Sequence, residues 1–367
     1  MRILSALILA ALFGTTLHAQ GVITRIDSDG THFYYNGVAD LQNVFEDATL
    51  NGLGTDTIIF SGGAFVLTTE LQITSPVVVI GSGIRTDSSA VYGGTTEINP
   101  SGNFSVVALQ NGADGSEIHG VTFGNQVRLG SNQADSDVDE VKFYRCNFGV
   151  LAIGNGGNNQ TLANGILIEQ CVIRDELRAQ YSTDLRVRNS FLKNIGYTDA
   201  NTNVEIKNCI IPGYDGTNGF ILYENSIFLT NAATLNVTGN AAFTNCLFVG
   251  NGTLFAQNVT FAPSILTNVD PRYSPDLAAA FASVPNVPLG TGYTAYQLNG
   301  NYATTPIYSN APYLGTDGLP RGIYGGDAPW KDGSLPFNPH WSLLTTPGNT
   351  SNGVLQGVHI KASAQEN

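Results

Sequence analysis

One pattern of about eight residues recurs along the middle of the chain, and it limits the fold more than any other feature. Its copies begin at Glu117, Val141, Ile166, Leu185, Val204, Ile221, Ala241 and Leu254. Aligned copies share a column that holds Val121, Cys146, Cys171, Ser190, Cys209, Ser226, Cys246 and Val259. The column before it is Gly120, Arg145, Gln170, Asn189, Asn208, Asn225, Asn245 and Asn258. Repetition of this kind predicts copies of one small unit stacked on each other.

Within each copy, apolar and polar residues alternate, which is typical of a strand buried on one face. In the copy "LRVRNSFL" from Leu185, the alternation slips by one residue at Asn189. Such a slip would turn the apolar set outward unless the chain bends there. Asn tolerates the left-handed backbone conformation that a bend of this kind needs. Each copy is therefore predicted to be a strand, a bend at the Asn column and a second strand.

Measured along the Cys/Ser column, successive copies are separated by 25, 25, 19, 19, 17, 20 and 13 residues. A step of about 19 residues is one turn of a wide coil, whose stacked turns pair as parallel strands about 4.8 Å apart. Parallel crossovers are overwhelmingly right-handed. The pattern thus predicts an all-β fold, a right-handed single-stranded parallel β-helix (solenoid) over residues 56–269. The two longer steps are interpreted as turns with an extended loop.

The four cysteines all fall in the Cys/Ser column of the repeat. Cys171, Cys209 and Cys246 are separated from each other by intervening Ser copies, and two turns place Cα atoms roughly 9.6 Å apart, too far for a disulfide. Cys146 and Cys171 lie on neighbouring turns, where side-by-side parallel geometry suits a disulfide poorly. We therefore expect four buried free thiols, against the usual preference of exported proteins for disulfides.

The two ends of the chain depart from the repeat. Residues 1–19, with Arg2 followed by an apolar stretch, have the form of a signal peptide, so we expect a secreted, extracellular or cell-surface protein. Residues 20–55 are expected to form an N-terminal cap with a short amphipathic helix, because Leu41, Val44, Phe45 and Ala48 follow a helical spacing. Residues 270–367 are expected to form an irregular C-terminal extension and cap.

Composition narrows the range of partners. Charged residues make up only 12% of the chain and its net charge is −13, so nucleic acids and anionic membranes are excluded as partners. No segment after the leader is long and apolar enough to span a membrane. The protein is expected to be a monomer that binds a glycan or polysaccharide and requires no cofactor, with Ca²⁺ as the one alternative.

Several of these motifs resemble the pectate-lyase-type right-handed β-helix superfamily, in particular its secreted bacterial members of unassigned activity. The likeness rests on the Asn column and "EIHGVTF" from Glu117, on "DTIIFSGGAFVL…PVVVIGSGIRTDSS" over 56–89, and on "GTDGLPRGIYGGDAPW" over 315–330. It implies a parallel β-helix with an extracellular role. The Asp pair, Gly-His-Gly and Arg-Ile-Lys motifs of polygalacturonase-like members are absent from this chain. Fold likeness alone does not establish an activity.

The outward positions of the repeat contain a small basic group formed by Arg186, Arg188 and Lys207, bordered by Glu169 and Glu205. One interpretation is a strip that binds acidic polysaccharide, in which an Arg or Lys acts as the base of a β-elimination. The alternative is a set of cross-strand ion pairs on a solvated face, and that interpretation is favoured.

Two further sets of residues are candidates for binding. Asp135, Asp137 and Asp139 alternate in a loop, and alternate acids can converge on Ca²⁺. A solubilising acidic loop is the favoured alternative. Tyr144 lies in the outward column, where its ring could stack on a sugar, although packing against loops is the more common role of such a ring.

Two functions remain open from the sequence. The first is an exported, non-catalytic β-helix that acts as an extracellular or cell-surface binding or structural module for glycans. The second is a polysaccharide lyase or hydrolase that acts on acidic polysaccharide through the basic group.

Overall fold

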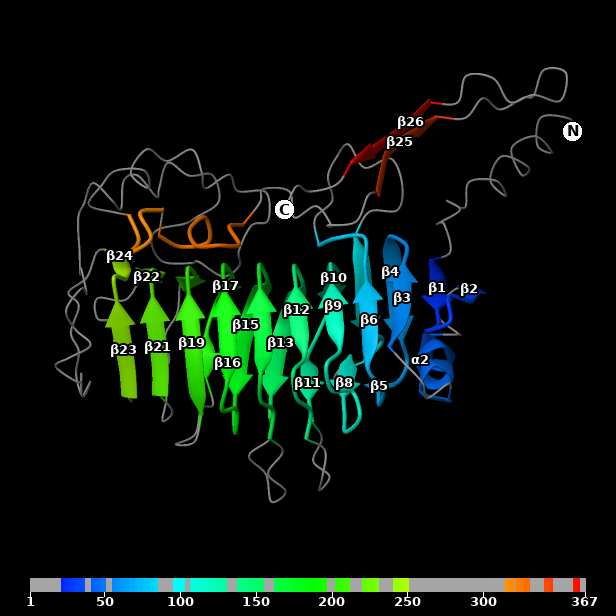
Figure 1. Cartoon of the computed structure of the whole chain (residues 1–367), viewed down its shortest axis with the longest axis horizontal. Helices are drawn as coiled ribbons and strands as arrows, with labels where there is room; N and C mark the ends of the chain where they lie inside the picture. The colour runs from blue at the N-terminus through cyan, green and yellow to red at the C-terminus, as the bar shows by residue number, and fades with distance from the viewer. Residues whose placement is uncertain are drawn as a thin grey trace, which may run out of the picture.

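The computed structural model of the chain is a parallel β-solenoid with very little helix (Figure 1). It describes residues 21–36, 41–50, 55–84, 95–102, 106–130, 137–154, 162–196, 202–211, 220–230, 240–250, 314–319, 321–330, 340–345 and 359–363. The predicted signal peptide and the copy of the repeat at Leu254 lie outside these residues.

Two sheets form the solenoid and run along its whole length. The first sheet has 11 strands in the order β2-β1-β3-β6-β9-β12-β14-β16-β19-β21-β23. These are β1 Val22–Ile26, β2 His32–Asn36, β3 Asp56–Phe60, β6 Val77–Ile80, β9 Glu117–His119, β12 Lys142–Tyr144, β14 Ile166–Glu169, β16 Leu185–Arg188, β19 Asn203–Lys207, β21 Phe220–Glu224 and β23 Asn240–Thr244. From β3 onward every neighbouring pair is parallel.

The second sheet has 13 strands, and its main path runs β24-β22-β20-β17-β15-β13-β10-β7-β4. The strands of this path are β4 Gly63–Leu67, β7 Thr96–Pro100, β10 Val121–Phe123, β13 Asn147–Ile153, β15 Val172–Ala179, β17 Phe191–Leu192, β20 Ile210–Ile211, β22 Ile227–Thr230 and β24 Leu247–Gly250. Beside it lie β5 Leu71–Ile73, β8 Val107–Leu109, β11 Val127–Leu129 and β18 Ile195–Gly196.

The bend between the two sheets is formed by the Asn column, as the sequence predicts. Arg145, Gln170 and the four Asn residues of this column all have positive φ, between 47° and 53°. Gly120 takes the same conformation with φ 64°. The copies stack in register, so that Arg188 of β16 pairs with Glu169 on one side and with Lys207 on the other. The predicted unit of strand, bend and strand is confirmed in the seven copies that the structure describes.

The solenoid has a third side that sequence reasoning did not identify. The early turns contain a third strand, which continues beyond the second strand and pairs along β5, β8, β11, the end of β13, the end of β15 and β18. Val127 and Leu129 of β11 bury their side chains in the core. This third side is also present in a 19-residue step, because β15 lies between Cys171 and Ser190. In the 25-residue step from Cys146 the extra residues follow the third strand, since 12 residues separate Ile153 from Ile166 whereas 5 separate the paired positions Ala179 and Leu185. The longer step therefore lengthens the connection to the next turn, as the sequence predicts.

The interior is a column of stacked, mostly apolar side chains. Phe143 is fully buried, and its ring meets that of Phe148 edge to face at a centroid distance of 5.2 Å. Phe148 in turn stacks on Phe123 of the preceding turn. All four cysteines are buried and free, which confirms the prediction from their column. Aromatic and aliphatic burial on this scale is the main stabilising term of such a fold.

At its N-terminal end the first sheet continues as an antiparallel hairpin. Strand β1 pairs antiparallel with both β2 and β3, an arrangement that the sequence did not indicate. Arg25 of β1 forms a buried ion pair with Asp56 at 3.1 Å. Helix α2, Leu41–Leu50, occupies the predicted helical region and buries Leu41, Val44 and Phe45 in the core cluster. The side chain of Ala48 lies outside the described residues.

Two parts of the C-terminal region are described. Residues 314–319 and 321–330, here called the C-terminal cover, lie along the bend edge of the last turns and are drawn in orange (Figure 1). Strands β25, His340–Thr345, and β26, His359–Ser363, pair antiparallel. No helix in the described residues has the length and apolar character needed to cross a membrane.

Candidate functional site

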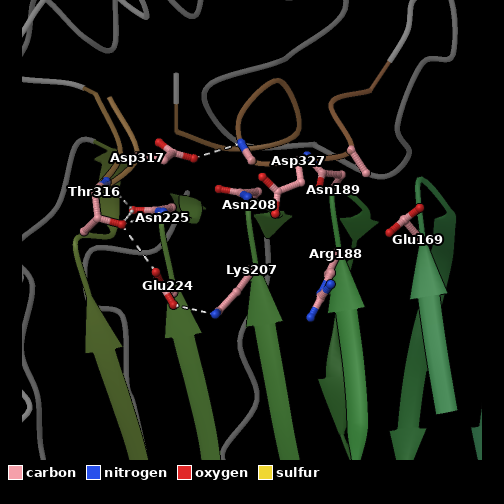
Figure 2. Close-up of a pocket in the computed structure, with 12 residues that line it drawn as sticks. Glu169, Arg188, Asn189, Lys207, Asn208, Glu224, Asn225, Thr316, Asp317 and Asp327 are labelled. Carbon is pink, nitrogen blue, oxygen red and sulfur yellow. Dashed lines mark hydrogen bonds and ion pairs between the residues drawn. The ribbon is translucent and has the colours of Figure 1, made fainter. Parts of the chain in front are cut away.

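A cavity of about 220 Å³ lies between the bend edge of the first sheet and the C-terminal cover (Figure 2). It is lined by Glu169, Arg188, Asn189, Lys207, Asn208, Glu224, Asn225, Thr316, Asp317, Gly326, Asp327 and Ala328. Clefts that enclose whole drug-sized ligands measure about 300–1,000 Å³. This cavity therefore suits one small unit, such as a single ring of a longer molecule.

The parallel register of the solenoid builds one wall of the cavity. Glu169, Arg188, Lys207 and Glu224 occupy equivalent outward positions at the ends of β14, β16, β19 and β21, and each is paired with the next. The residue after each of these is the bend residue, whose side chain is an amide. A second row, of amide side chains, therefore runs beside the charged row on the side of the cover. A single repeating sequence pattern thereby places four charged side chains in one row.

The C-terminal cover forms the other wall, and the bend side chains hold it in place. Asn189 Nδ2 donates to the carbonyl oxygens of Ile323 and Gly325, at 3.0 and 2.6 Å. Gln170 Nε2 donates to the carbonyl oxygens of Ala328 and Pro329. Further contacts link Asn225 to Thr316, Asn245 to Leu314 O, and Arg321 to Asn245. The bend amides act here as donors to an irregular backbone, whose carbonyl groups would otherwise lack partners.

Gly326 allows the cover to approach the bends closely. A Cβ atom added to Gly326 would lie 2.0 Å from Asn208 Nδ2, and the residue has φ 71°. Any other residue would therefore meet both steric overlap and an unfavourable backbone conformation. Its amide N–H donates to Asp317 Oδ2 at 3.0 Å, which ties the two halves of the cover together.

Lys207 is committed to two carboxylates. Its Nζ lies 2.9 Å from Glu205 Oε1 and 2.9 Å from Glu224 Oε2. Burial favours the neutral amine, but the hydrogen bonds to Glu205 and Glu224 outweigh it and hold the pKa of Lys207 above its usual value. A side chain that keeps its proton this firmly is a poor general base near neutral pH.

Arg188 and Glu169 face each other across neighbouring strands without a direct ion pair. Within the described part of the chain, Arg188 makes no ion pair, and its buried Nε has no hydrogen-bond partner. Burial raises the pKa of Glu169, while the positive charges of Arg188 and Arg145 partly oppose that effect. These two side chains are consequently the ones in the row that remain open to a ligand.

Asn208 lines the same cavity and has a buried amide oxygen without a partner. The residue is only 7% exposed, and its Oδ1 is buried with no hydrogen-bond partner among the described residues. An unsatisfied buried amide oxygen costs about 1–3 kcal/mol. Buried polar groups in folded proteins are nearly always paired, so this oxygen is a local cost in the wall of the cavity.

The structure brings some of the predicted site residues together and separates others. Arg188, Lys207 and Glu169 line the cavity, whereas Glu205 reaches it only through its ion pair with Lys207. Arg186 does not line the cavity, and its guanidinium instead makes two hydrogen bonds to Asp184. Tyr144 lies one turn before Glu169 and stacks on His119 with ring centroids 4.7 Å apart.

The acidic loop residues have a local structural role. Asp137 Oδ1 accepts a hydrogen bond from Leu162 N, and Asp139 Oδ1 accepts one from Asn164 N, so each carboxylate binds the backbone of the next turn. The described residues contain no cluster of three or more His, Cys, Asp or Glu side chains that could hold a metal ion. Asp135 lies outside the described residues.

Sequence reasoning missed the contribution of the cover to the site. Thr316, Asp317 and Asp327 lie more than 90 positions beyond Glu224, in a region where the repeat is lost. The motif "GTDGLPRGIYGGDAPW" is unusually rich in Gly and Asp, and that enrichment was the one available signal. Comparisons with models of known protein families, with curated proteins and with solved structures found no match for this chain.

Proposed function

We propose that this protein is an exported, non-catalytic β-solenoid of the pectate-lyase-like superfamily that binds a glycan in the cavity beneath its C-terminal cover. The observation that carries the proposal is the polar cavity itself, in whose lining Arg188 makes no ion pair among the described residues. Fixed amide, carboxylate and guanidinium groups are suited to the hydroxyl groups of a sugar. The size of the cavity fits a single sugar unit of a longer chain.

The protonation of Lys207, in the row of charged side chains at the strand ends, favours a binding role over catalysis. Lys207 retains its proton between two carboxylates, and so is unsuited to abstract a proton from a substrate. The sequence motifs of polygalacturonase-like members are also missing. Export and an extracellular or cell-surface location are inferred from the leader over residues 1–19.

One observation favours the alternative, a lyase or hydrolase. Burial raises the pKa of Glu169, and a carboxyl group with a raised pKa next to an open guanidinium can donate a proton to a leaving group. This reaction class makes a distinct prediction, namely product formation that depends on Glu169.

The test combines binding and product analysis on the mature chain from Gln20. Binding to a panel of neutral, aminated and acidic polysaccharides is measured together with reducing ends and unsaturated products. Glycan binding without products is expected. Asn208→Gly, which keeps the bend conformation but removes the amide, should weaken binding about 2- to 10-fold, and Glu46→Gln on the exposed side of α2 should not. Product formation that is lost in Glu169→Gln would establish the enzyme instead.

Export has its own test. Expression of the full chain in a bacterial host should release a mature protein whose N-terminal residue is Gln20, as determined by N-terminal sequencing. Retention of an uncleaved chain inside the cell would refute the export proposal and leave the binding proposal intact.

A further inference from the structure

The cavity carries an excess of negative charge. Its lining contains four carboxylates and two cations, the carboxylates being Glu169, Glu224, Asp317 and Asp327 and the cations Arg188 and Lys207. The charge of Lys207 is already compensated by Glu205 and Glu224 at 2.9 Å each. A cavity with this balance, on a chain of net charge −13, repels a further anion.

The groups that remain open are mostly hydrogen-bond acceptors. Asp317 is used within the cover, since its Oδ1 accepts from Leu319 N and its Oδ2 from Gly326 N. Glu169 and the exposed Asp327 make no hydrogen bond among the described residues, and when ionised both can only accept hydrogen bonds. Among the described residues that line the cavity, Arg188 is the one charged donor without an ion pair. The ligand must therefore bring donors of its own.

Figure 2 shows how these groups are arranged. Asp327 extends from the cover toward the bend residues Asn189 and Asn208, while Glu169 and Arg188 project from the strands below. Acceptors consequently approach the cavity from both walls. A hydroxyl or ammonium group could satisfy them, whereas a carboxylate or sulfate would face Asp327, Glu169 and Glu224 with only the Arg188 guanidinium open to it.

We propose that the bound sugar unit carries no negative charge, and that an amine-bearing sugar binds more tightly than a neutral one. This inference rests on the proposed glycan-binding function and names its ligand class. It differs from the acidic polysaccharides that the superfamily resemblance suggests, because those would require a basic cavity. Affinity should fall in the order aminated, neutral and uronic.

The experiment uses oligosaccharides of one length that differ only in the substituent. There are three series, one each of glucose, mannose and galactose configuration, and each series has a neutral, an aminated and a uronic member. Their affinities are measured by calorimetry at low and at high salt. Within the series that binds, the aminated member should bind most tightly, and its advantage over the neutral member should shrink as salt screens the charges. A uronic member that binds most tightly would overturn the inference while leaving glycan binding established. Absence of binding in all three series would overturn the proposed function itself.

Charge variants make the test specific to the cavity. Asp327→Asn removes one open carboxylate and no described hydrogen bond, so it should weaken binding of the aminated member about 2- to 5-fold. Arg188→Gln removes the one uncommitted cation and should strengthen the same binding by a similar factor. Glu46→Gln makes the same change of net charge as Asp327→Asn, but on α2 at the opposite end of the solenoid (Figure 1), and should leave affinity unchanged. Equal effects of Glu46→Gln and Asp327→Asn would refute a local cause.

Discussion

Replacing Asn189 by glycine should release the C-terminal cover from the bends of the solenoid. Asn189 is 2% exposed, has φ 47° and donates two hydrogen bonds to the cover, to Ile323 O and Gly325 O. Glycine accepts the same backbone conformation without strain, so the substitution isolates the loss of these bonds. Each contributes about 0.5–1.5 kcal/mol, which gives a total of about 1–3 kcal/mol.

Limited proteolysis measures this loss directly. Trypsin can cut after Arg321 only when the cover opens, because that residue is 3% exposed and bonded to Asn245. When opening is fast relative to cleavage, the cleavage rate follows the population of the open state. A loss of about 1–3 kcal/mol corresponds to a rate increase of about 5- to 150-fold, quantified by mass spectrometry of the peptide that ends at Arg321.

Asn208→Gly is the matched control for this experiment. Asn208 has nearly the same φ, 53°, and lies one turn away, but its side chain makes no hydrogen bond to the cover among the described residues. Both positions have positive φ, so any backbone effect of introducing glycine is common to both variants and cancels in the comparison. Equal cleavage rates in the two variants would refute the idea that the amide of Asn189 holds the cover.

Three further outcomes are expected. Phe143→Ala should lower the free energy of unfolding by about 3–5 kcal/mol in urea titrations, because it opens a cavity in the aromatic column; a cost below about 1 kcal/mol would contradict the close packing. Burial raises the pKa of Cys209 and Cys246 to about 12, so iodoacetamide should label neither in the native protein, while urea should expose four thiols without any reductant. Burial raises the pKa of Glu169 above its unfolded value, so the folded state binds that proton more tightly. Thermal stability should then decline as pH rises from about 4.3 through the raised folded pKa, and Glu169→Gln should remove that component; an unchanged pH profile would contradict it.

The sequence predicted the bends and the core because both depend on local pattern. Asn189 and Asn208 reveal the bend through a one-residue slip in alternation, and positive φ at both confirms it. The free thiols followed from the same alignment, since Ser190 separates Cys171 from Cys209. A pattern that repeats once per turn shows which face of each strand is buried. In a solenoid, the alignment of successive copies then determines the register of neighbouring strands.

Other features could not be predicted because they depend on contacts between distant or weakly patterned segments. The third strand at β11 has only three residues, too few for a clear alternation. The antiparallel pairing of β1 has no counterpart in the repeat. The cover reaches the bends through contacts such as Gln170 to Ala328, which are 158 residues apart and bind main-chain carbonyl oxygens. Contacts to backbone atoms place little demand on side-chain identity, so the sequence carries almost no record of them.

The cover also changes how the last turns unfold. In a stack where each layer touches only its neighbours, layers can fray one after another from an open end. Here one continuous stretch of main chain is pinned to bends on several layers, from Gln170 to Asn245. Loss of the outermost layer must therefore break attachments that also stabilise layers further in. Unfolding from this end should involve several layers as one cooperative block, with a correspondingly steep dependence on denaturant.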